Sequence, residues 1–209
     1  KKILGQHHNA VYIAYVLRFH PVIKELKKTL QRHRMLHMRV TATSYAPGWR
    51  PQKEFKHLYS ASTKQGGGVI LDLSHELDYI QYLTGNLSKI SGQYGRSGNI
   101  TIDAEDYADL LLETPQGPVN VHIDYFSRNS QRMIQIDFEK FSLDADLINF
   151  TIRKFTAKAS QRRKIPGSLD QCYQQQMECF LERRSSGFSN LDEAEKLLKN
   201  ILDFKRKYK

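Results

Sequence analysis

Apolar and polar residues alternate along much of the middle of the chain. Between Met35 and Tyr45 most apolar residues fall on even-numbered positions and the polar ones on odd-numbered positions, which predicts a strand with one buried face. The alternation recurs from Leu87 to about Phe155 in five or six short runs separated by turn residues. The pattern predicts a sheet that is mostly antiparallel.

Elsewhere apolar residues recur every three or four positions, which predicts helices. One helix begins at Pro21 and runs to about His33, and two more close the chain at roughly Leu169–Ser185 and Asp192–Tyr208. The run 10–19 is instead apolar on both faces and predicts a central strand. Together the patterns predict an α+β fold, in which a large, mostly antiparallel open sheet carries helices packed on one face.

A glycine triplet, Gly66-Gly67-Gly68, precedes the helix that is the strongest candidate for chemistry. This helix is expected to run to Thr84 and to end at Gly85-Asn86. Glycine tolerates sharp turns and close approach to other groups. The triplet is therefore expected to leave room beside the first helical turn for a small polar substrate.

Polar side chains fall on one strip of this helix. At 100° per residue Asp72, His75 and Tyr79 share that strip, with Tyr82 at its margin. An imidazole titrates near neutral pH, so His75 is a candidate for taking or releasing a proton. The alternative interpretation is an ordinary surface pair or a buried histidine without a catalytic role.

The string from Gly66 to Asp78 resembles the GGG-x-x-x-D-x-x-(x)-H-x-x-D helix of the glucose–fructose oxidoreductase / inositol dehydrogenase (Gfo/Idh/MocA) family of NAD(P)-dependent sugar dehydrogenases. In that family the histidine is the catalytic acid/base and the preceding aspartate assists it. The resemblance implies these roles for His75 and Asp72. The commoner family spacing is Asp-x-x-x-His and the spacing here is Asp-x-x-His, so the role of His75 transfers more directly.

The same resemblance implies which other residues meet the substrate. Sugars stack on aromatic faces, although Trp49 can equally be a plain hydrophobic plug. The residues expected to line the substrate pocket are Arg18, Trp49, Tyr82, Gly67 and Gly68.

The junction Arg18-Phe19-His20-Pro21 resembles the family's crossing from the cofactor domain into the substrate domain. The resemblance implies that residues 1–19 are a remnant of a Rossmann domain, ending in its last strand, and that residues 20–209 form the substrate-binding and oligomerisation domain. Neither Gly-x-Gly-x-x-Gly nor the family's Glu-Lys-Pro motif occurs in the sequence. We therefore expect NAD or NADP to be bound mainly by the missing N-terminal domain, and this chain to be inactive alone.

Composition narrows the remaining possibilities. The 209 residues are 40% hydrophobic, which suffices for a core, and no run approaches the ~18 apolar residues that span a bilayer. The net charge of +10 is scattered and no nucleic-acid-binding motif accompanies it, so we expect a solvated basic surface and no nucleic-acid partner. Cys172 and Cys179 lie seven positions apart in a predicted helix, too far to bridge each other, which indicates a reduced, cytoplasmic protein.

Histidine pairs raise the alternative of a metal site. His33 and His37 straddle a predicted helix–strand boundary, His7-His8 stand near the start, and no third ligand accompanies either pair. We therefore expect no metal.

Two functional classes remain. The first is the C-terminal part of an NAD(P)-dependent oxidoreductase that acts on a hydroxyl of a sugar, cyclitol or sugar nucleotide, for which the resemblance implies a homodimer or homotetramer formed through the sheet. The second is a non-catalytic binding or assembly domain on the same scaffold.

Overall fold

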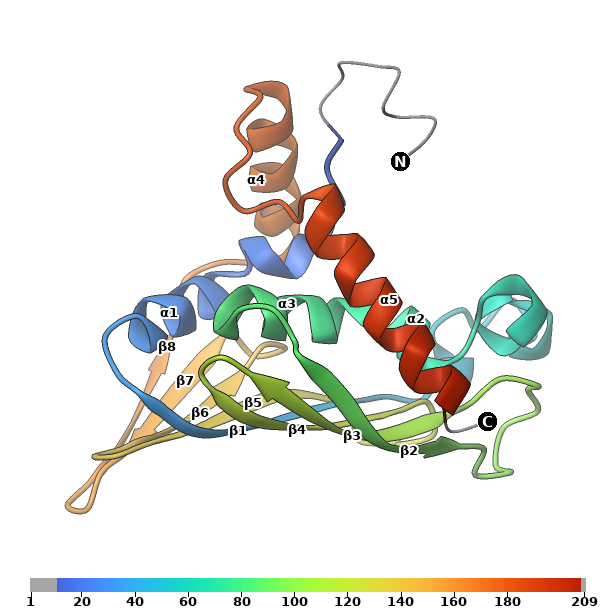
Figure 1. Cartoon of the computed structure of the whole chain (residues 1–209), viewed down its shortest axis with the longest axis horizontal. Coiled ribbons are helices and arrows are strands. Elements are labelled where there is room, and N and C mark those ends of the chain that lie inside the picture. The colour runs from blue at the N-terminus through green and yellow to red at the C-terminus, as the bar shows by residue number, and fades with distance from the viewer. Residues whose placement is uncertain (1–10, 208–209) are drawn as a thin grey trace.

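A single eight-stranded sheet forms the base of the computed structural model, which describes residues 11–207 (Figure 1). The strand order is β2-β3-β4-β1-β5-β6-β7-β8. Only the β1–β4 pair is parallel among the paired strands of the described residues. The strands are β1 Met35–Thr43, β2 Lys89–Gly95, β3 Tyr107–Thr114, β4 Gly117–Asp124, β5 Gln131–Phe138, β6 Ser142–Asp146, β7 Thr151–Phe155 and β8 Ser160–Lys164.

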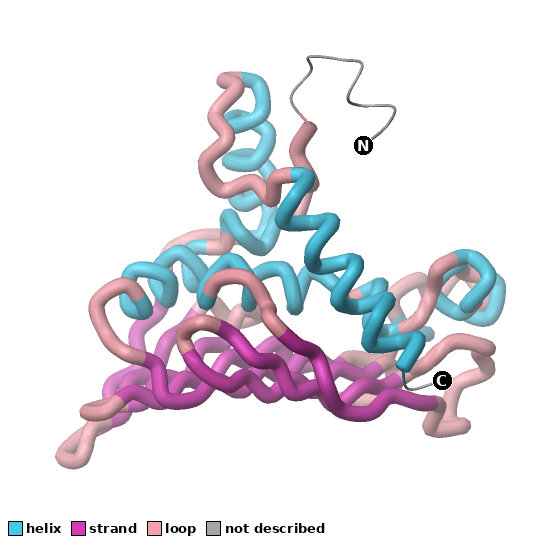
Figure 2. Tube along the Cα trace, viewed as in Figure 1, coloured by secondary structure: helices cyan, strands magenta, loops and turns pink. Residues whose placement is uncertain are grey.

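The helices lie on one face of this sheet and leave the other face open (Figure 2). Alternation produces this asymmetry: in β4 the side chains of Val119, Val121 and Ile123 are buried, whereas Asn120 and His122 face the open side. The predicted fold class is thereby confirmed. The helices are α1 Pro21–Leu30, α2 Val69–Asp72, α3 Ser74–Thr84, α4 Leu169–Leu181 and α5 Leu191–Lys207.

The strands between Leu87 and Phe155 do not form a simple meander, because β1 is inserted between β4 and β5. At the start of β1 a register shift between Met35 and His37 breaks the alternation that the sequence predicts. Met35 is therefore buried at 2% exposure, while Leu36, predicted to be buried, is 48% exposed.

The strand predicted over residues 10–19 is wrong where the structure describes it. Val16–Phe19 forms a 3₁₀ turn, and Ile13 makes only an isolated bridge to Ser189. A strand that is apolar on both faces needs sheet neighbours on both edges, and within residues 11–207 no other strand flanks this segment. Its apolar side chains are buried instead by the turn, which packs against α4.

The helix predicted after the glycine triplet is present but interrupted. Leu73 leaves helical geometry, with φ −95° and ψ 23°, and so separates α2 from α3. Helix α3 ends at Gly85, as predicted. The interruption changes the direction of Asp72 relative to His75, so the two do not continue one helical strip.

His20 caps the first helix. Its Nδ1 accepts the backbone N–H of Val22 at 3.2 Å, and its Nε2 lies 3.1 Å from the Leu147 carbonyl oxygen. The ring is 1% exposed and stacks on Phe150 at 4.3 Å between centroids. Burial lowers the pKa of His20 from 6.5 to about 4, so the folded protein holds this imidazole neutral.

This neutral cap predicts an acid-sensitive contribution to stability. As the pH falls from 6.5 towards 4, His20 becomes protonated in the unfolded chain but stays neutral in the folded protein, because its pKa is lower there. The free energy of unfolding should therefore decline over this range by about 3 kcal/mol because of His20. In His20→Asn, which keeps a cap acceptor without the titration, urea unfolding from pH 4 to 7 should show a flatter decline. The matched variant His57→Asn changes a side chain that is 72% exposed, and its free energy of unfolding should depend on pH as in the wild type. The same pH dependence in the wild type and both variants would contradict the role of His20.

Candidate active site

His75 lies in the first turn of α3, directly above β5. Its Nε2 is 3.1 Å from Oε1 of Glu76 and 3.1 Å from Nη2 of Arg132 on β5. The imidazole is 29% exposed, whereas the Glu76 side chain is fully buried. One edge of the histidine therefore rests on an internal ion pair, and part of the ring reaches the surface.

The ion pair beneath His75 joins the helix to the sheet. Arg132 Nε lies 2.9 Å from Glu76 Oε1, close enough to pair the charges although the geometry is not that of a directed hydrogen bond. Burial alone would raise the pKa of Glu76, but Arg132 and then His75 lower it overall, so the carboxylate is ionised. The hydroxyl of Tyr79 lies beside this carboxylate, and burial first, then Glu76, raises its pKa, so the phenol stays neutral.

This arrangement gives His75 two ways to bond. With a proton on Nε2 the ring can donate to Glu76, which leaves Nδ1 unprotonated and able to accept a proton. Without that proton, Nε2 can accept from Arg132. A charged imidazolium would face both the buried carboxylate and the Arg132 guanidinium, each with an atom 3.1 Å from Nε2. The geometry is that of a group able to exchange a proton.

Asp72 belongs to an adjacent aromatic cluster. Its Oδ2 accepts the hydroxyl of Tyr125 at 2.7 Å, and burial together with Asp72 raises the pKa of that phenol. Trp49 packs edge-on against Tyr125 at 5.3 Å between centroids and remains 43% exposed. Two predicted site residues, Asp72 and Trp49, are thus linked through Tyr125, which the sequence did not single out.

The glycines of the triplet serve close packing. A Cβ on Gly67 would collide with the carbonyl oxygen of Tyr59, and a Cβ on Gly68 would lie 2.5 Å from the Glu105 carboxylate. Glu105 is held there by Lys205, whose Nζ is 2.6 Å from Oε1. The expected room for substrate beside Gly67 and Gly68 is therefore filled by the chain's own atoms.

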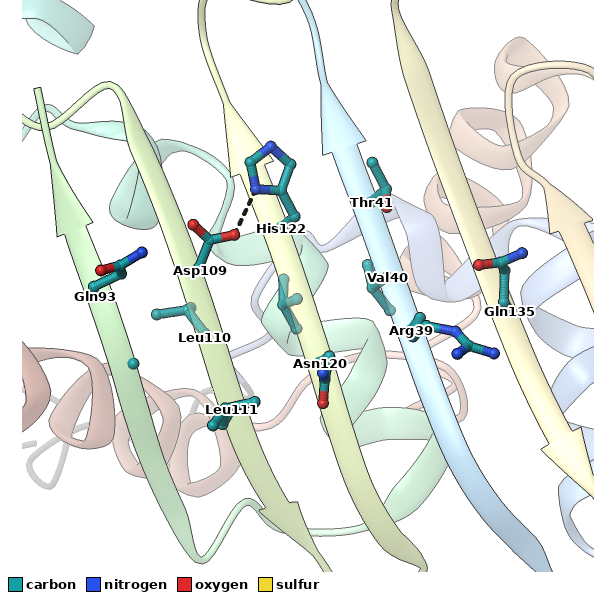
Figure 3. Close-up of a pocket in the computed structure, with 12 residues that line it drawn as sticks. Arg39, Val40, Thr41, Gln93, Asp109, Leu110, Leu111, Asn120, His122 and Gln135 are labelled. Carbon is teal, nitrogen blue, oxygen red and sulfur yellow. Dashed lines mark hydrogen bonds and ion pairs between the residues drawn. The ribbon is translucent and has the colours of Figure 1, made fainter. Parts of the chain in front are cut away.

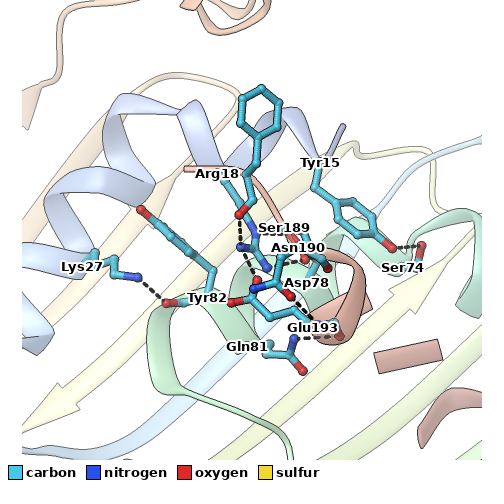
Figure 4. Close-up of polar contacts among 11 residues, drawn as sticks. Tyr15, Arg18, Lys27, Ser74, Asp78, Gln81, Tyr82, Ser189, Asn190 and Glu193 are labelled. Carbon is cyan, nitrogen blue, oxygen red and sulfur yellow. Dashed lines mark hydrogen bonds and ion pairs between the residues drawn. The ribbon is translucent and has the colours of Figure 1, made fainter. Parts of the chain in front are cut away.

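Arg18 and Tyr82 lie elsewhere, around a hollow of about 480 Å³ that has no wall from His75 or Asp72 (Figure 4). The Arg18 side chain is 2% exposed and makes a two-pronged contact with Asp78, both distances being 2.8 Å. It also bonds Glu193 at 2.8 Å and the Phe188 carbonyl at 3.0 Å. Burial would lower the pKa of Arg18, but these carboxylates raise it overall. The contacts account for Arg18 as an internal anchor; its predicted role towards substrate stays a prediction.

Glu76 and Arg132 are the site residues that the sequence analysis missed. Both stand where the hydrophobic pattern calls for an apolar residue: Glu76 precedes the buried Leu77 on α3, and Arg132 shares the inward-facing register of Ile134 on β5. A single acid on a buried helix face and a single base on a buried strand face together predict an ion pair. That signal was present and was not used.

The open face of the sheet has a broad hollow of about 580 Å³ (Figure 3). His122 lies across it, with Nδ1 2.7 Å from Asp109 and Nε2 3.2 Å from the buried Asp124. The hollow also has Arg39 and Gln135 on its far side. The hollow is open and its lining mixes apolar with polar side chains, which suits a contact surface better than an enclosed small-molecule site.

Other expectations concern metals, thiols and membranes. Across residues 11–207 no three His, Cys, Asp or Glu side chains gather as a metal site would require; the pair His7-His8 lies outside the described residues. Cys172 and Cys179 are both buried free thiols. Within the same part of the chain, none of the helices combines the length and apolar character needed to cross a membrane.

Comparison with known proteins matches residues 24–144 to the family model described as the GFO/IDH/MocA C-terminal domain. No curated protein matches the sequence. Among solved structures, a UDP-N-acetylglucosamine 3-dehydrogenase from Acidithiobacillus ferrooxidans is similar with TM-score 0.75 and 15% identity, over 99% of this chain and 64% of that one.

Two further solved structures share the fold. An aldose-aldose oxidoreductase from Caulobacter crescentus, complexed with glycerol, has TM-score 0.75 and 15% identity over 97% of this chain and 62% of that one. An oxidoreductase from Agrobacterium radiobacter, in complex with NAD+, L-tartaric acid and magnesium, has TM-score 0.73 and 16% identity over 95% of this chain and 62% of that one. The chain thus spans less than two thirds of the length of each of these structures.

The buried Arg18–Asp78 pair predicts a large stability effect. Asp78→Asn removes the negative charge that faces the guanidinium of Arg18, whose side chain is 2% exposed. It should lower the free energy of unfolding by about 3–5 kcal/mol. Glu193→Gln removes a carboxylate that is 37% exposed and should cost less than about 1 kcal/mol. Urea unfolding measures both.

The apolar double variant Arg18→Met/Asp78→Leu is the control. It leaves no unpaired charge in the buried Arg18–Asp78 pair, and Glu193, which also loses Arg18, is 37% exposed, so the variant should recover much of the loss. Equal, small effects for Asp78→Asn and Glu193→Gln would show that the pair is not an anchor.

Proposed function

This chain belongs to the Gfo/Idh/MocA family, and from that premise we propose that it is the substrate-binding part of an NAD(P)-dependent oxidoreductase acting on a hydroxyl of a sugar, cyclitol or sugar nucleotide. The observation that carries the proposal is the placement of His75, partly exposed on the buried Glu76–Arg132 pair. The sugar and sugar-nucleotide enzymes among the similar structures support the substrate class.

His75 is the proposed acid/base. Oxidation of an alcohol requires that the hydroxyl lose its proton while the carbon loses a hydride, and a nicotinamide cofactor supplies the hydride-accepting chemistry. In the tautomer that carries its proton on Nε2, which gives up the hydrogen bond from Arg132, the Nδ1 atom of His75 can take the hydroxyl proton, and Nε2 then lies 3.1 Å from an ionised carboxylate. Arg132 keeps that carboxylate ionised and fixes the ring from the sheet side. Asp72, held by Tyr125, is proposed to accept a second substrate hydroxyl, with Trp49 beside it.

The described residues do not fit the cofactor by themselves. The glycine triplet leads into the four-residue α2, and its inner surface is occupied by Tyr59 and Glu105, so no phosphate group can be cradled there. We infer that NAD or NADP is bound mainly by a separate Rossmann domain, that residues 1–19 belong to the junction with it, and that residues 20–209 are the substrate domain.

Helix α4 supports this division. It stands away from the sheet and contacts the turn Val16–Phe19 (Figure 1). Its Tyr173, Met177 and Phe180 are 54%, 57% and 52% exposed. These residues recur at helical spacing and form an uncovered apolar stripe, which is the surface expected of a domain interface. We infer that the stripe packs on the dinucleotide-binding domain. The free thiols of Cys172 and Cys179 support a cytoplasmic location.

The function is tested in the protein that joins these residues to a dinucleotide-binding domain. His75→Ala should lower kcat by about 10²–10⁴, because a positioned general base is lost, while the melting temperature stays close to that of the wild type. Asp72→Asn should cost less, because Asp72 is proposed to bind a second substrate hydroxyl and not the one that reacts. Steady-state kinetics and thermal unfolding, measured on the same preparations, separate the two effects.

Glu76→Gln is the companion variant. It should also lower kcat, by less than His75→Ala, because the ring keeps its place but loses its counter-charge. A His75→Ala protein with normal kcat, or one that merely unfolds, would contradict the catalytic role. A joined wild-type protein without activity on any sugar hydroxyl would favour the non-catalytic binding or assembly domain.

The open sheet face is proposed as the contact between copies in a homodimer or homotetramer. Leu111 is 52% exposed on this face, and Leu198 on α5 is 48% exposed away from it. Leu111→Arg should dissociate the oligomer because it places charge in the contact, whereas the matched Leu198→Arg should leave it intact. Light scattering coupled to gel filtration measures both masses. A monomeric wild-type protein, or equal dissociation by both variants, would refute this contact.

A further inference from the structure

A second hollow, of about 660 Å³, lies at one end of the sheet. Three short segments enclose it: the turn after α1, the turn between β5 and β6, and the end of β7. We name it the basic hollow after its four cationic side chains, Arg32, Arg34, Lys140 and Lys154. It shares no residue with the cluster around His75, so it is independent of the proposed catalytic function.

The protein balances few of the charges of the basic hollow: Arg32 acts electrostatically on Glu25, which lies outside the hollow. Glu139 is the one acidic residue among those that line the hollow, whereas four lining residues are basic. Within residues 11–207 no hydrogen bond or ion pair engages the side chains of Arg32, Arg34 or Lys140, although other exposed arginines of this chain, such as Arg163 with Glu25, do find carboxylates. Holding like charges together is unfavourable unless an anion joins them.

The floor of the basic hollow is aromatic and ordered. Phe138 and Phe141 stack at 4.6 Å between centroids, and His33 stands edge-on to Phe141 at 5.0 Å. The Lys154 ammonium lies 4.2 Å from the centre of the Phe141 ring. A ring face does not use all three N–H donors of an ammonium, so Lys154 is held in position and keeps donors for an anion.

The backbone fixes the other cations as well. The Phe138 N–H donates to the Phe141 carbonyl at 2.9 Å, which closes the tight turn that carries Lys140. The His33 N–H donates to the Thr29 carbonyl at 3.0 Å, which holds the turn between Arg32 and Arg34 onto the end of α1. The backbone that carries these exposed cations is thus held in place, and all four residues line one hollow.

We propose that the basic hollow binds a small polyphosphate, a di- or triphosphate group either free or at the end of a nucleotide. Phosphate oxygens accept charge-assisted hydrogen bonds, and the planar guanidinium forks of Arg32 and Arg34 suit them in particular. The volume lies within the range of small-molecule sites. The cations form a compact cluster and do not extend as a track, which favours a small anion over a nucleic-acid strand.

Calorimetric titration of the full chain with tripolyphosphate and with ATP tests the proposal. The variant Arg34→Ala/Lys140→Ala/Lys154→Ala should weaken binding of both by about tenfold or more, because each lost charged contact removes a strong hydrogen bond. The control Lys53→Ala/Lys64→Ala/Lys199→Ala loses the same charge from exposed positions outside the hollow and should change the dissociation constant by less than about twofold.

The two probes also distinguish the source of the phosphate. Equal affinity would show that a free polyphosphate suffices, and tighter binding of ATP would show that the nucleoside contributes on the aromatic floor. The imidazole proton resonances of His33 should shift during either titration, while those of His57, outside the hollow, should not.

Three results would overturn the proposal: no binding by the wild type, equal loss in the two triple variants, or binding of single-stranded DNA without binding of tripolyphosphate. If circular dichroism shows that the triple variant is unfolded, Lys140→Gln, a change at an exposed turn residue, replaces it with the same readout.

Discussion

The buried ion pair between Arg18 and Asp78 determines how the helical layer is assembled. One guanidinium joins the N-terminal turn to α3 through Asp78 and to the start of α5 through Glu193. Because an unpaired charge at this depth would be strongly unfavourable, the three segments are stable only in the arrangement that satisfies it. The orientation of α3 follows from that pair, and so does the direction in which His75 points.

The opposite side of α3 repeats the same physical device at the sheet. Glu76 pairs with Arg132, so the helix is fixed by one ion pair above and another below. The helix cannot rotate without separating a buried carboxylate from its partner. The close packing at Gly67 and Gly68 fixes the entry to this region, since backbone and carboxylate atoms occupy the space where side chains would lie. A rigid support of this kind suits a residue that must meet a substrate in one geometry.

Much of this could be predicted from the sequence, where the signal was local. Alternation gave the strands and the open face, and helical spacing gave α1, α4 and α5, because burial imposes a period on each element. The errors concern long-range partners. The run 10–19 has the composition of a central strand but turns because its partners are α3, α4 and α5, and Leu36 is displaced by a single register shift. Likewise Asp72 and His75 are three positions apart in the sequence, yet their contacts are distant along the chain. Tyr125 directly follows β4 and Arg132 lies on β5, and no helical wheel includes either residue.

β1 is among the first elements of the chain, but it lies in the sheet between strands that are synthesised much later. Met38 pairs with Val119 on one side and with Ile136 on the other, so both ladders join residues far apart in sequence. Contacts of this range form slowly, because a long loop must close before any bond is gained. During synthesis β1 has no strand partner until β4 has emerged, and its second edge stays unpaired until β5 follows. The order of synthesis therefore sets the earliest moment at which this sheet can close.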